Sequence, residues 1–212
     1  MSILNLTRKI IPKLSAIKAE NIRAINGIPE NILTKMVQNG DKTIQKIGMN
    51  ESKGVRILEN GTNTVFTDGL NGCNGVQCIA KGLDGNPIIV ASHYTPLEAS
   101  RALNKKAIEE QLQTYDYYLD KTTKPKIFYN ITGKETNGQL VANENPLISQ
   151  LKSVFDKFFK QGYEEKVIPY QSTSKTPFDS NAMISQFEKS SKGWDVKLTT
   201  VGEKEHNIHL WG

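Results

Sequence analysis

The chain has 212 residues, 37% of them hydrophobic, and carries a formal net charge of +5 at pH 7. This length provides for one substantial hydrophobic core, so we expect a single domain over residues 1–212. No apolar run approaches the roughly 20 residues of a membrane-spanning helix. This excludes an integral membrane protein built from such helices and predicts no membrane partner.

The whole net charge falls in residues 1–50, which hold eight Lys and Arg against three Asp and Glu and contain no aromatic residue. Apolar residues recur at helical spacing over 7–25 and 29–37, so we interpret 1–50 as a basic N-terminal helical segment and 51–212 as the core. A basic arm that binds an acidic partner and a pair of helices with solvated lysines both fit this composition. Two arginines and no aromatic residue predict no nucleic-acid binding.

Two short strands are predicted next, at 54–59 and 62–67, joined by the turn dipeptide Asn60-Gly61. Strands at 73–81 and 88–93 follow, connected through a loop rich in Gly, Asp and Asn that gives a strong hairpin signal. The run at 88–93 is apolar on both faces, so we expect it to lie in the middle of a sheet.

Cys73 and Cys78 fall on this hairpin, on opposite faces of one strand, so they are not expected to bridge each other. Depending on where the loop is centred, His93 lies opposite either Cys73 or Val76, and both registers leave the thiol and the imidazole at the same end of the hairpin. Cys78 faces residues 88–91 in the apolar middle. Cys73 is therefore the candidate for chemistry and Cys78 the candidate for packing.

The remaining chain combines two long helices with further strands. The helices are predicted at 96–120 and 146–162, and each begins with a cap residue followed by proline, in Thr95-Pro96 and Asn145-Pro146. The strands are predicted at 125–132, 163–170, 183–187, 194–201 and 207–211. About eight or nine strands, mostly linked as hairpins, predict an α+β fold in which an antiparallel or mixed sheet packs against helices.

A reactive thiol needs a backbone bend that presents it, a base nearby and a group that orients the base. The segment 67–75 is rich in Gly and Asn and predicts the bend before Cys73, and His93 is the candidate base. Either Thr67 or Asp68 could orient the imidazole, and the sequence leaves both open. The alternative is a buried structural cysteine beside a structural histidine.

Two further groups of polar residues were considered as sites. His206 and His209 are three residues apart on a predicted strand, which directs them to opposite faces, so no metal site is predicted. Ser92 and Ser100 lack the G-x-S-x-G turn that is typical of serine hydrolases. The Cys-His pair is thus the main candidate for chemistry.

Thr67, the run Leu70-Asn71-Gly72-Cys73 and the downstream His93 resemble the Cys-His-Thr site of the glutamine deamidase superfamily. This superfamily includes the CheD chemoreceptor deamidases, the catalytic domain of cytotoxic necrotizing factor and the Burkholderia lethal factor. The length and the Leu-x-Gly-Cys run resemble lethal factor-like toxins most. The step from Thr67 to Cys73 matches the family, whereas the step from Cys73 to His93 is longer. The resemblance covers residues 67–93 and implies a sandwich-like core with helices outside.

Carried over onto this sequence, the resemblance implies that Cys73 is the nucleophile, that His93 is its base, and that Thr67 holds the imidazole. Backbone N–H groups of the turn would stabilise the oxyanion, and the turn residues are Leu70, Asn71 and Gly72. The implied activity of the catalytic core at 51–212 is a thiol-dependent protein-glutamine amidohydrolase, which converts Gln to Glu on a host protein as a bacterial toxin or effector. We expect a monomer, a protein substrate with a reactive glutamine, and neither metal nor cofactor.

The sequence starts without the charged-then-apolar order of a secretory signal peptide. We therefore expect a protein that is secreted or injected into the host cytosol by a signal-peptide-independent route, or one that stays in the bacterial cytoplasm. Three alternative functions use the same thiol: a housekeeping CheD-like receptor deamidase, a cysteine protease or acyltransferase, and a non-catalytic binding protein with a structural thiol.

Overall fold

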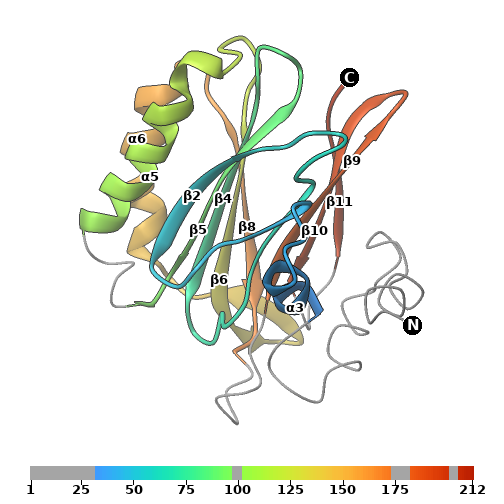
Figure 1. The fold of residues 1–212 in the computed structure, drawn as a ribbon. Coiled ribbons are helices and arrows are strands. Elements are labelled where there is room, and N and C mark those ends of the chain that lie inside the picture. The colour runs from blue at the N-terminus through green and yellow to red at the C-terminus, as the bar shows by residue number, and fades with distance from the viewer. Residues whose placement is uncertain (1–31, 97–101, 173–181, 201–204) are drawn as a thin grey trace, which may run out of the picture.

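The computed structural model describes the residues 32–96, 102–172, 182–200 and 205–212. They form three layers: two long helices, a six-stranded sheet and a five-stranded sheet (Figure 1). The predicted α+β fold with a sandwich-like core and helices outside is confirmed. The helix predicted at 7–25 lies outside the described residues. No helix of the described part is long and apolar enough to cross a membrane.

The six-stranded sheet carries the predicted hairpin at its centre. Its strands are β2 (Glu51–Arg56), β4 (Asn74–Lys81), β5 (Pro87–Tyr94), β6 (Lys126–Thr136), β7 (Gln139–Ala142) and β8 (Glu164–Tyr170). Their order is β2-β5-β4-β6, with β7 and β8 both pairing with β6. The β4–β5 hairpin is antiparallel, and β5 lies between β2 and β4, which confirms its central place. Strand β8 runs parallel to β6, so the chain between them crosses over through α6 (Pro146–Phe158).

The five-stranded sheet takes its strands from both ends of the described chain. They are β1 (Ile44–Lys46), β3 (Thr64–Thr67), β9 (Met183–Ser190), β10 (Gly193–Thr200) and β11 (His206–Trp211), and they pair in the order β1-β3-β9-β10-β11. The three strands predicted in the tail are confirmed. All neighbours are antiparallel except β1 and β3, which are parallel.

The prediction that the N-terminal segment is helical throughout is wrong for residues 32–50, which also contain a strand. The short helix predicted at 29–37 is present as α3 (Ile32–Gln38). Strand β1 then pairs with β3 and completes the five-stranded sheet, with the Ile44 side chain buried. Three strand residues are too few to show an alternating pattern, which is why the sequence did not reveal them.

The Asn60-Gly61 turn joins the two sheets instead of closing a hairpin. Strand β2 pairs with β5 in one sheet, and β3 pairs with β1 and β9 in the other. The turn is held locally by Leu58, whose N–H donates to the Thr62 carbonyl at 3.0 Å. The dipeptide thus bends the chain as predicted, but the strands that it joins separate into different layers.

The β6–β7 hairpin is a second feature that the sequence analysis missed. Asn137 and Gly138 both have positive φ, at 53° and 74°, and they connect the two strands through a two-residue turn. This is the conformation for which Asn-Gly is the strongest short signal. The Asn137-Gly138 dipeptide is therefore a local signal from which this hairpin could have been predicted.

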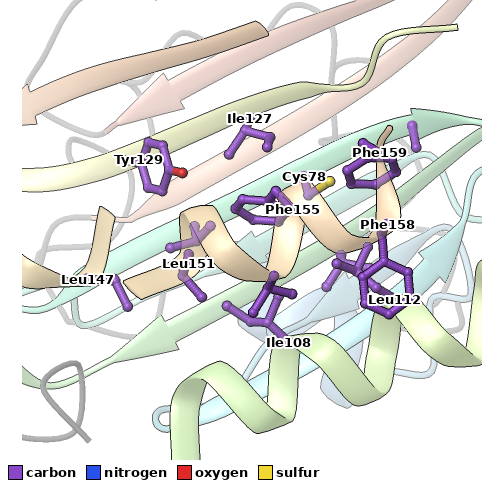
Figure 2. Packing of buried hydrophobic residues seen from close by; sticks show 14 of the residues in the cluster. Cys78, Ile108, Leu112, Ile127, Tyr129, Leu147, Leu151, Phe155, Phe158 and Phe159 are labelled. Atoms are coloured by element: carbon purple, nitrogen blue, oxygen red, sulfur yellow. The ribbon is translucent and has the colours of Figure 1, made fainter. Parts of the chain in front are cut away.

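The largest core lies between the helices and the six-stranded sheet (Figure 2). Helix α6 starts at the predicted cap, where the Asn145 side chain accepts a hydrogen bond from the Leu147 N–H at 2.9 Å. The residues of α6 that are buried are Leu147, Leu151, Val154, Phe155 and Phe158. Helix α5 (Ala102–Tyr115) adds Ile108 and Leu112 to the same core.

Alternation along the central hairpin decides which side chains reach which layer. On β4, Val76 and Cys78 belong to the core under the helices, whereas Ile79 belongs to the core between the two sheets. On β5, Ile89 and Ala91 face the second sheet. Because the period of a strand is two residues, the side chain of residue 93 faces the second sheet as well.

Candidate active site

The register of the hairpin places His93 directly opposite Gly75. Both predicted partners, Cys73 and Val76, are therefore wrong. The loop spans residues 82–86, so its centre falls on residue 84, and this register pairs His93 with Gly75. Cys73 lies just before β4 and two residues from Gly75, so it is on the same face as His93. Cys78 pairs with Val90 on the opposite face, within the predicted range.

A hydrogen bond of 2.7 Å joins Thr67 Oγ1 to His93 Nδ1. Both side chains are fully buried, and they come from different sheets, Thr67 from the end of β3 and His93 from β5. The Thr67 hydroxyl also lies 3.5 Å from the carbonyl oxygen of Asp68. If the hydroxyl donates to that carbonyl, then Nδ1–H donates to Thr67 and Nε2 carries no proton.

The Asp68 carboxylate, the other possible orienter, is bound elsewhere. It accepts hydrogen bonds from Lys46 Nζ at 2.8 Å and from Thr34 Oγ1 at 2.9 Å. The structure therefore brings the Thr67 hydroxyl, and not Asp68, into contact with the imidazole. Asp68 and Lys46 act on His93 only through their charges.

His93 is neutral at pH 7. Burial lowers the pKa of its imidazole to about 4, the Asp68 charge opposes this shift, and the Lys46 charge adds to it. Within the described part of the chain, Nε2 of His93 is buried and has no hydrogen-bond partner. A neutral imidazole with one nitrogen held and the other free is the form that a general base requires.

Cys73 is 5% exposed and packs against the apolar side chains of Leu70, Tyr170 and Met183. This burial raises the pKa of the thiol, so it is protonated at neutral pH. Since His93 Nε2 has no partner, no hydrogen bond joins the thiol to the imidazole. The structure thus places the thiol and the imidazole on one face without a hydrogen bond between them.

The predicted bend before Cys73 is present. Gly69 and Gly72 have φ of 75° and 81°, which is the region that favours glycine, and the Asn71 N–H donates to the Gly69 carbonyl at 2.6 Å. Leu70 is fully buried, so the bend is anchored in the protein interior. Asn71 and Gly72 are partly exposed, and their backbone leads directly to the thiol.

The bend is also held from the end of β8, which the sequence analysis missed. The buried Tyr170 hydroxyl donates a hydrogen bond to the Cys73 carbonyl, and Ser172 Oγ donates to Asn71 Oδ1 at 2.9 Å. These residues are about a hundred positions away in the chain, and no local pattern marks them. Only the parallel pairing of β8 with β6 brings them to the site.

A buried polar network adjoins the site between the two sheets. Ser185 Oγ donates to Gln77 Oε1, Gln77 Nε2 donates to Asn130 Oδ1 at 3.5 Å, and Asn130 Nδ2 donates to Thr200 Oγ1 at 2.6 Å. Asn130 pairs with Gly75 in the sheet, so the network starts next to the position opposite His93. Alternation on β4 could have placed Gln77 on this face, but not its partners.

The two C-terminal histidines and Ser92 do not join this site. His209 Nδ1 contacts Asp195 Oδ1 at 2.8 Å, and His206 Nδ1 lies 3.3 Å from Lys166 Nζ, so the two histidines have different neighbours. Ser92 is buried on the helix side, and Ser100 lies outside the described residues. No group of three potential metal ligands occurs among the described residues.

Comparisons with known proteins find similarity at the level of solved structures. No family model matches the chain. No curated protein matches it either. Among solved structures, it is similar to the C-terminal domain of CNFy from Yersinia pseudotuberculosis, with 12% sequence identity and a TM-score of 0.35. The alignment covers 78% of this chain and 61% of that one, and a likeness of this size carries no argument about function.

Proposed function

We propose that the protein is a cysteine-dependent deamidase that converts a glutamine of another protein to glutamate. Cys73 is the nucleophile, His93 the general base, and Thr67 the residue that orients the imidazole. The observation that carries the proposal is the hydrogen bond of 2.7 Å between Thr67 Oγ1 and His93 Nδ1. It fixes a buried, neutral imidazole on the same face as the thiol and leaves Nε2 free.

The proposed reaction has two steps. Cys73 Sγ bonds to the side-chain carbonyl carbon of the glutamine while its proton passes to His93 Nε2, and backbone N–H groups around Gly72 stabilise the oxyanion. The C–N bond then breaks, and the imidazolium returns the proton to the leaving ammonia. Water, deprotonated by His93, next attacks the thioester and releases glutamate and the free thiol. The sum is glutamine and water to glutamate and ammonia.

General-base transfer during attack fits this site better than a preformed ion pair. A thiolate–imidazolium pair requires a low thiol pKa and a high imidazole pKa. Burial shifts both groups in the opposite sense, raising the pKa of the Cys73 thiol and lowering that of His93 to about 4. The proton therefore passes from the thiol to the imidazole during the attack on the substrate, and not before.

We further propose that the enzyme acts as a monomeric toxin or effector on a host protein. The support is the resemblance of residues 67–93 to the deamidase toxins, together with a site that needs no added group for this chemistry. The same observations also fit a deamidase that acts on receptors of the producing cell. The identity of the modified glutamine depends on surfaces outside the catalytic geometry.

A non-catalytic protein with a structural thiol is the second candidate, because Cys73 is almost fully covered and its thiol pKa is raised. Incubation with host-cell lysate followed by peptide mass mapping separates the two. The deamidase converts one glutamine, or a few, to glutamate, and Cys73→Ser abolishes the conversion whereas Cys78→Ser does not. Backbone cleavage at the same target would indicate a protease. A lysate with neither change would refute an enzymatic role for this site.

A further inference from the structure

Gly75 is next to both Cys73 and His93, on the face that the two side chains share. It follows Cys73 by two residues on the same face, and it is the cross-strand partner of His93. A Cβ atom built at Gly75 would lie 2.7 Å from Met183 Sδ, 3.3 Å from Met183 Cε and 3.4 Å from Asn130 Cβ. The thioether of Met183 therefore occupies the space directly above this glycine.

Met183 reaches this space from the opposite sheet. It is the first residue of β9, is paired with Thr67 on one side and Thr200 on the other, and is 3% exposed. Its side chain also packs against Cys73. One flexible side chain thus covers the thiol and lies over the backbone position that separates the thiol from the imidazole.

The proposed reaction needs this same space for the substrate. The carboxamide carbon must reach Cys73 Sγ, and the departing nitrogen must reach His93 Nε2, so the carboxamide has to lie between the two groups. Glycine at position 75 leaves room for a flat group there. Methionine and glutamine side chains are both unbranched as far as the δ position, so a glutamine side chain has the shape to replace the thioether.

We propose that the space over Gly75 is the subsite for the substrate's carboxamide group, and that Met183 occupies it until substrate enters. This inference rests on the proposed function and assigns a specificity role to Gly75 and Met183. Methionine suits such a role because it has three rotatable bonds and tolerates repacking. The neighbouring Asn130 and Gln77 amides give this part of the interior a neutral polar character, which suits a carboxamide better than the carboxylate product.

Alkylation with iodoacetamide tests the subsite, since this reagent is itself a small primary carboxamide. In Met183→Ala the cover is removed, so Cys73 should react at least roughly tenfold faster than in the wild-type protein, whereas Cys78 stays unmodified. Met183→Leu, which keeps the volume, should stay close to the wild-type rate. An unchanged rate in Met183→Ala, or an equal gain at Cys78, would overturn the proposal.

A second pair of variants tests the position of the subsite. Adding Gly75→Val to Met183→Ala fills the vacated space with a branched side chain, so the alkylation of Cys73 should return toward the slow wild-type rate. If the double variant reacts as fast as Met183→Ala, the carboxamide does not bind over Gly75, and the proposal fails. Intact Cys78 in each variant shows that the core under the helices is still folded.

Peptide mass mapping of deamidated glutamines in the lysate, combined with alkylation of Cys73, distinguishes a failure of this inference from a failure of the proposed function. If the wild-type protein deamidates a target but Met183→Ala is alkylated at the wild-type rate, the subsite is wrong and the function stands. If Met183→Ala gains reactivity but no variant deamidates any protein, the deamidase proposal is wrong and the cover over Cys73 stands.

Discussion

The two cysteines lie five residues apart in the sequence, and both are buried, yet their surroundings differ completely. Cys78 pairs with Val90 and lies in the apolar core under the two helices, where Figure 2 shows it among aromatic and aliphatic side chains. Cys73 lies in a small cluster at the end of the layer between the sheets, on the face of His93. Burial raises the pKa of both thiols.

Exposure and thiol pKa therefore do not distinguish Cys73, the nucleophile that we propose, from Cys78 in the core. The two cysteines differ in the side chains that lie beside them on the same face of the strand. Around Cys78 the buried cluster consists of aliphatic and aromatic side chains and includes no histidine. Around Cys73 the same face carries an oriented imidazole, a glycine and a methionine.

The largest expected effect comes from making the same substitution at both cysteines. Cys73→Ser should lower kcat for glutamine deamidation by a factor on the order of 10³ or more, because a hydroxyl beside a weak base is a poor nucleophile. Cys78→Ser should leave kcat unchanged and lower the free energy of unfolding by about 1–3 kcal/mol, since it places a polar hydroxyl in the core under the helices. Steady-state kinetics and urea unfolding measure the two effects.

Removal of the base should have the next largest effect. His93→Ala should lower kcat by roughly 10²–10⁴-fold, with the substrate KM little changed, because the imidazole acts on protons in the transition state. His209→Ala is the matched control, since that histidine is exposed and paired with Asp195 on the far strand. A His93 variant with normal kcat would remove His93 from the mechanism.

Substitution of either residue that could orient the imidazole, Thr67 or Asp68, should have a smaller effect on activity. Thr67→Val removes the hydroxyl and keeps the shape, so kcat should fall by about 10–100-fold, as for other groups that orient a reactive side chain. Asp68→Asn should change kcat by less than about threefold, because Asp68 acts on His93 only through its charge. Thr67→Ser should restore most of the activity, which a purely structural loss would not allow.

The last prediction concerns stability and not rate. The imidazole pKa is about 4 in the folded chain against an ordinary value of 6.5, so between these values the unfolded chain binds a proton that the folded chain does not. The contribution of His93 is therefore complete above pH 6.5 and is lost as the pH falls toward 4, by about 3 kcal/mol in total.

Urea unfolding at several pH values checks this slope. The wild-type protein should lose stability between pH 6.5 and 4, and His93→Gln should lose clearly less in that window. Asp120 titrates lower, since hydrogen bonds from Thr122 bring its carboxyl pKa to about 2, so its contribution disappears only below about pH 4. Equal slopes for the two proteins would contradict the burial of a neutral imidazole.

Strong local signals were sufficient for much of the fold. The α6 cap at Asn145, the β4–β5 hairpin and the three tail strands could be predicted because each depends on neighbouring residues. The failures were non-local: Asn60-Gly61 turns the chain, but tertiary packing decides that its two strands enter different sheets. The three residues of β1 gain their pairing from β3 and not from their own pattern.

The site shows the same division between local and distant information. The bend at Gly72 and the place of Cys73 and His93 at the same end of one hairpin followed from glycine chemistry and the hairpin signal, whereas the register that puts them on one face did not. The choice between Thr67 and Asp68 did not, because it depends on how the second sheet lies over the first. Tyr170 and Met183 reach the thiol only through long-range strand pairing, so no spacing in the sequence could identify them.

The Thr67–His93 hydrogen bond joins side chains from the two sheets, and this makes the site sensitive to interlayer shear. A slip of one sheet past the other by about 1 Å would lengthen this bond beyond its useful range and could lower the rate by about a hundredfold. Bulky side chains between the layers, such as Phe187 and Trp194, therefore influence alignment at the thiol without touching it. The activity that we propose would therefore depend on how the two sheets pack against each other.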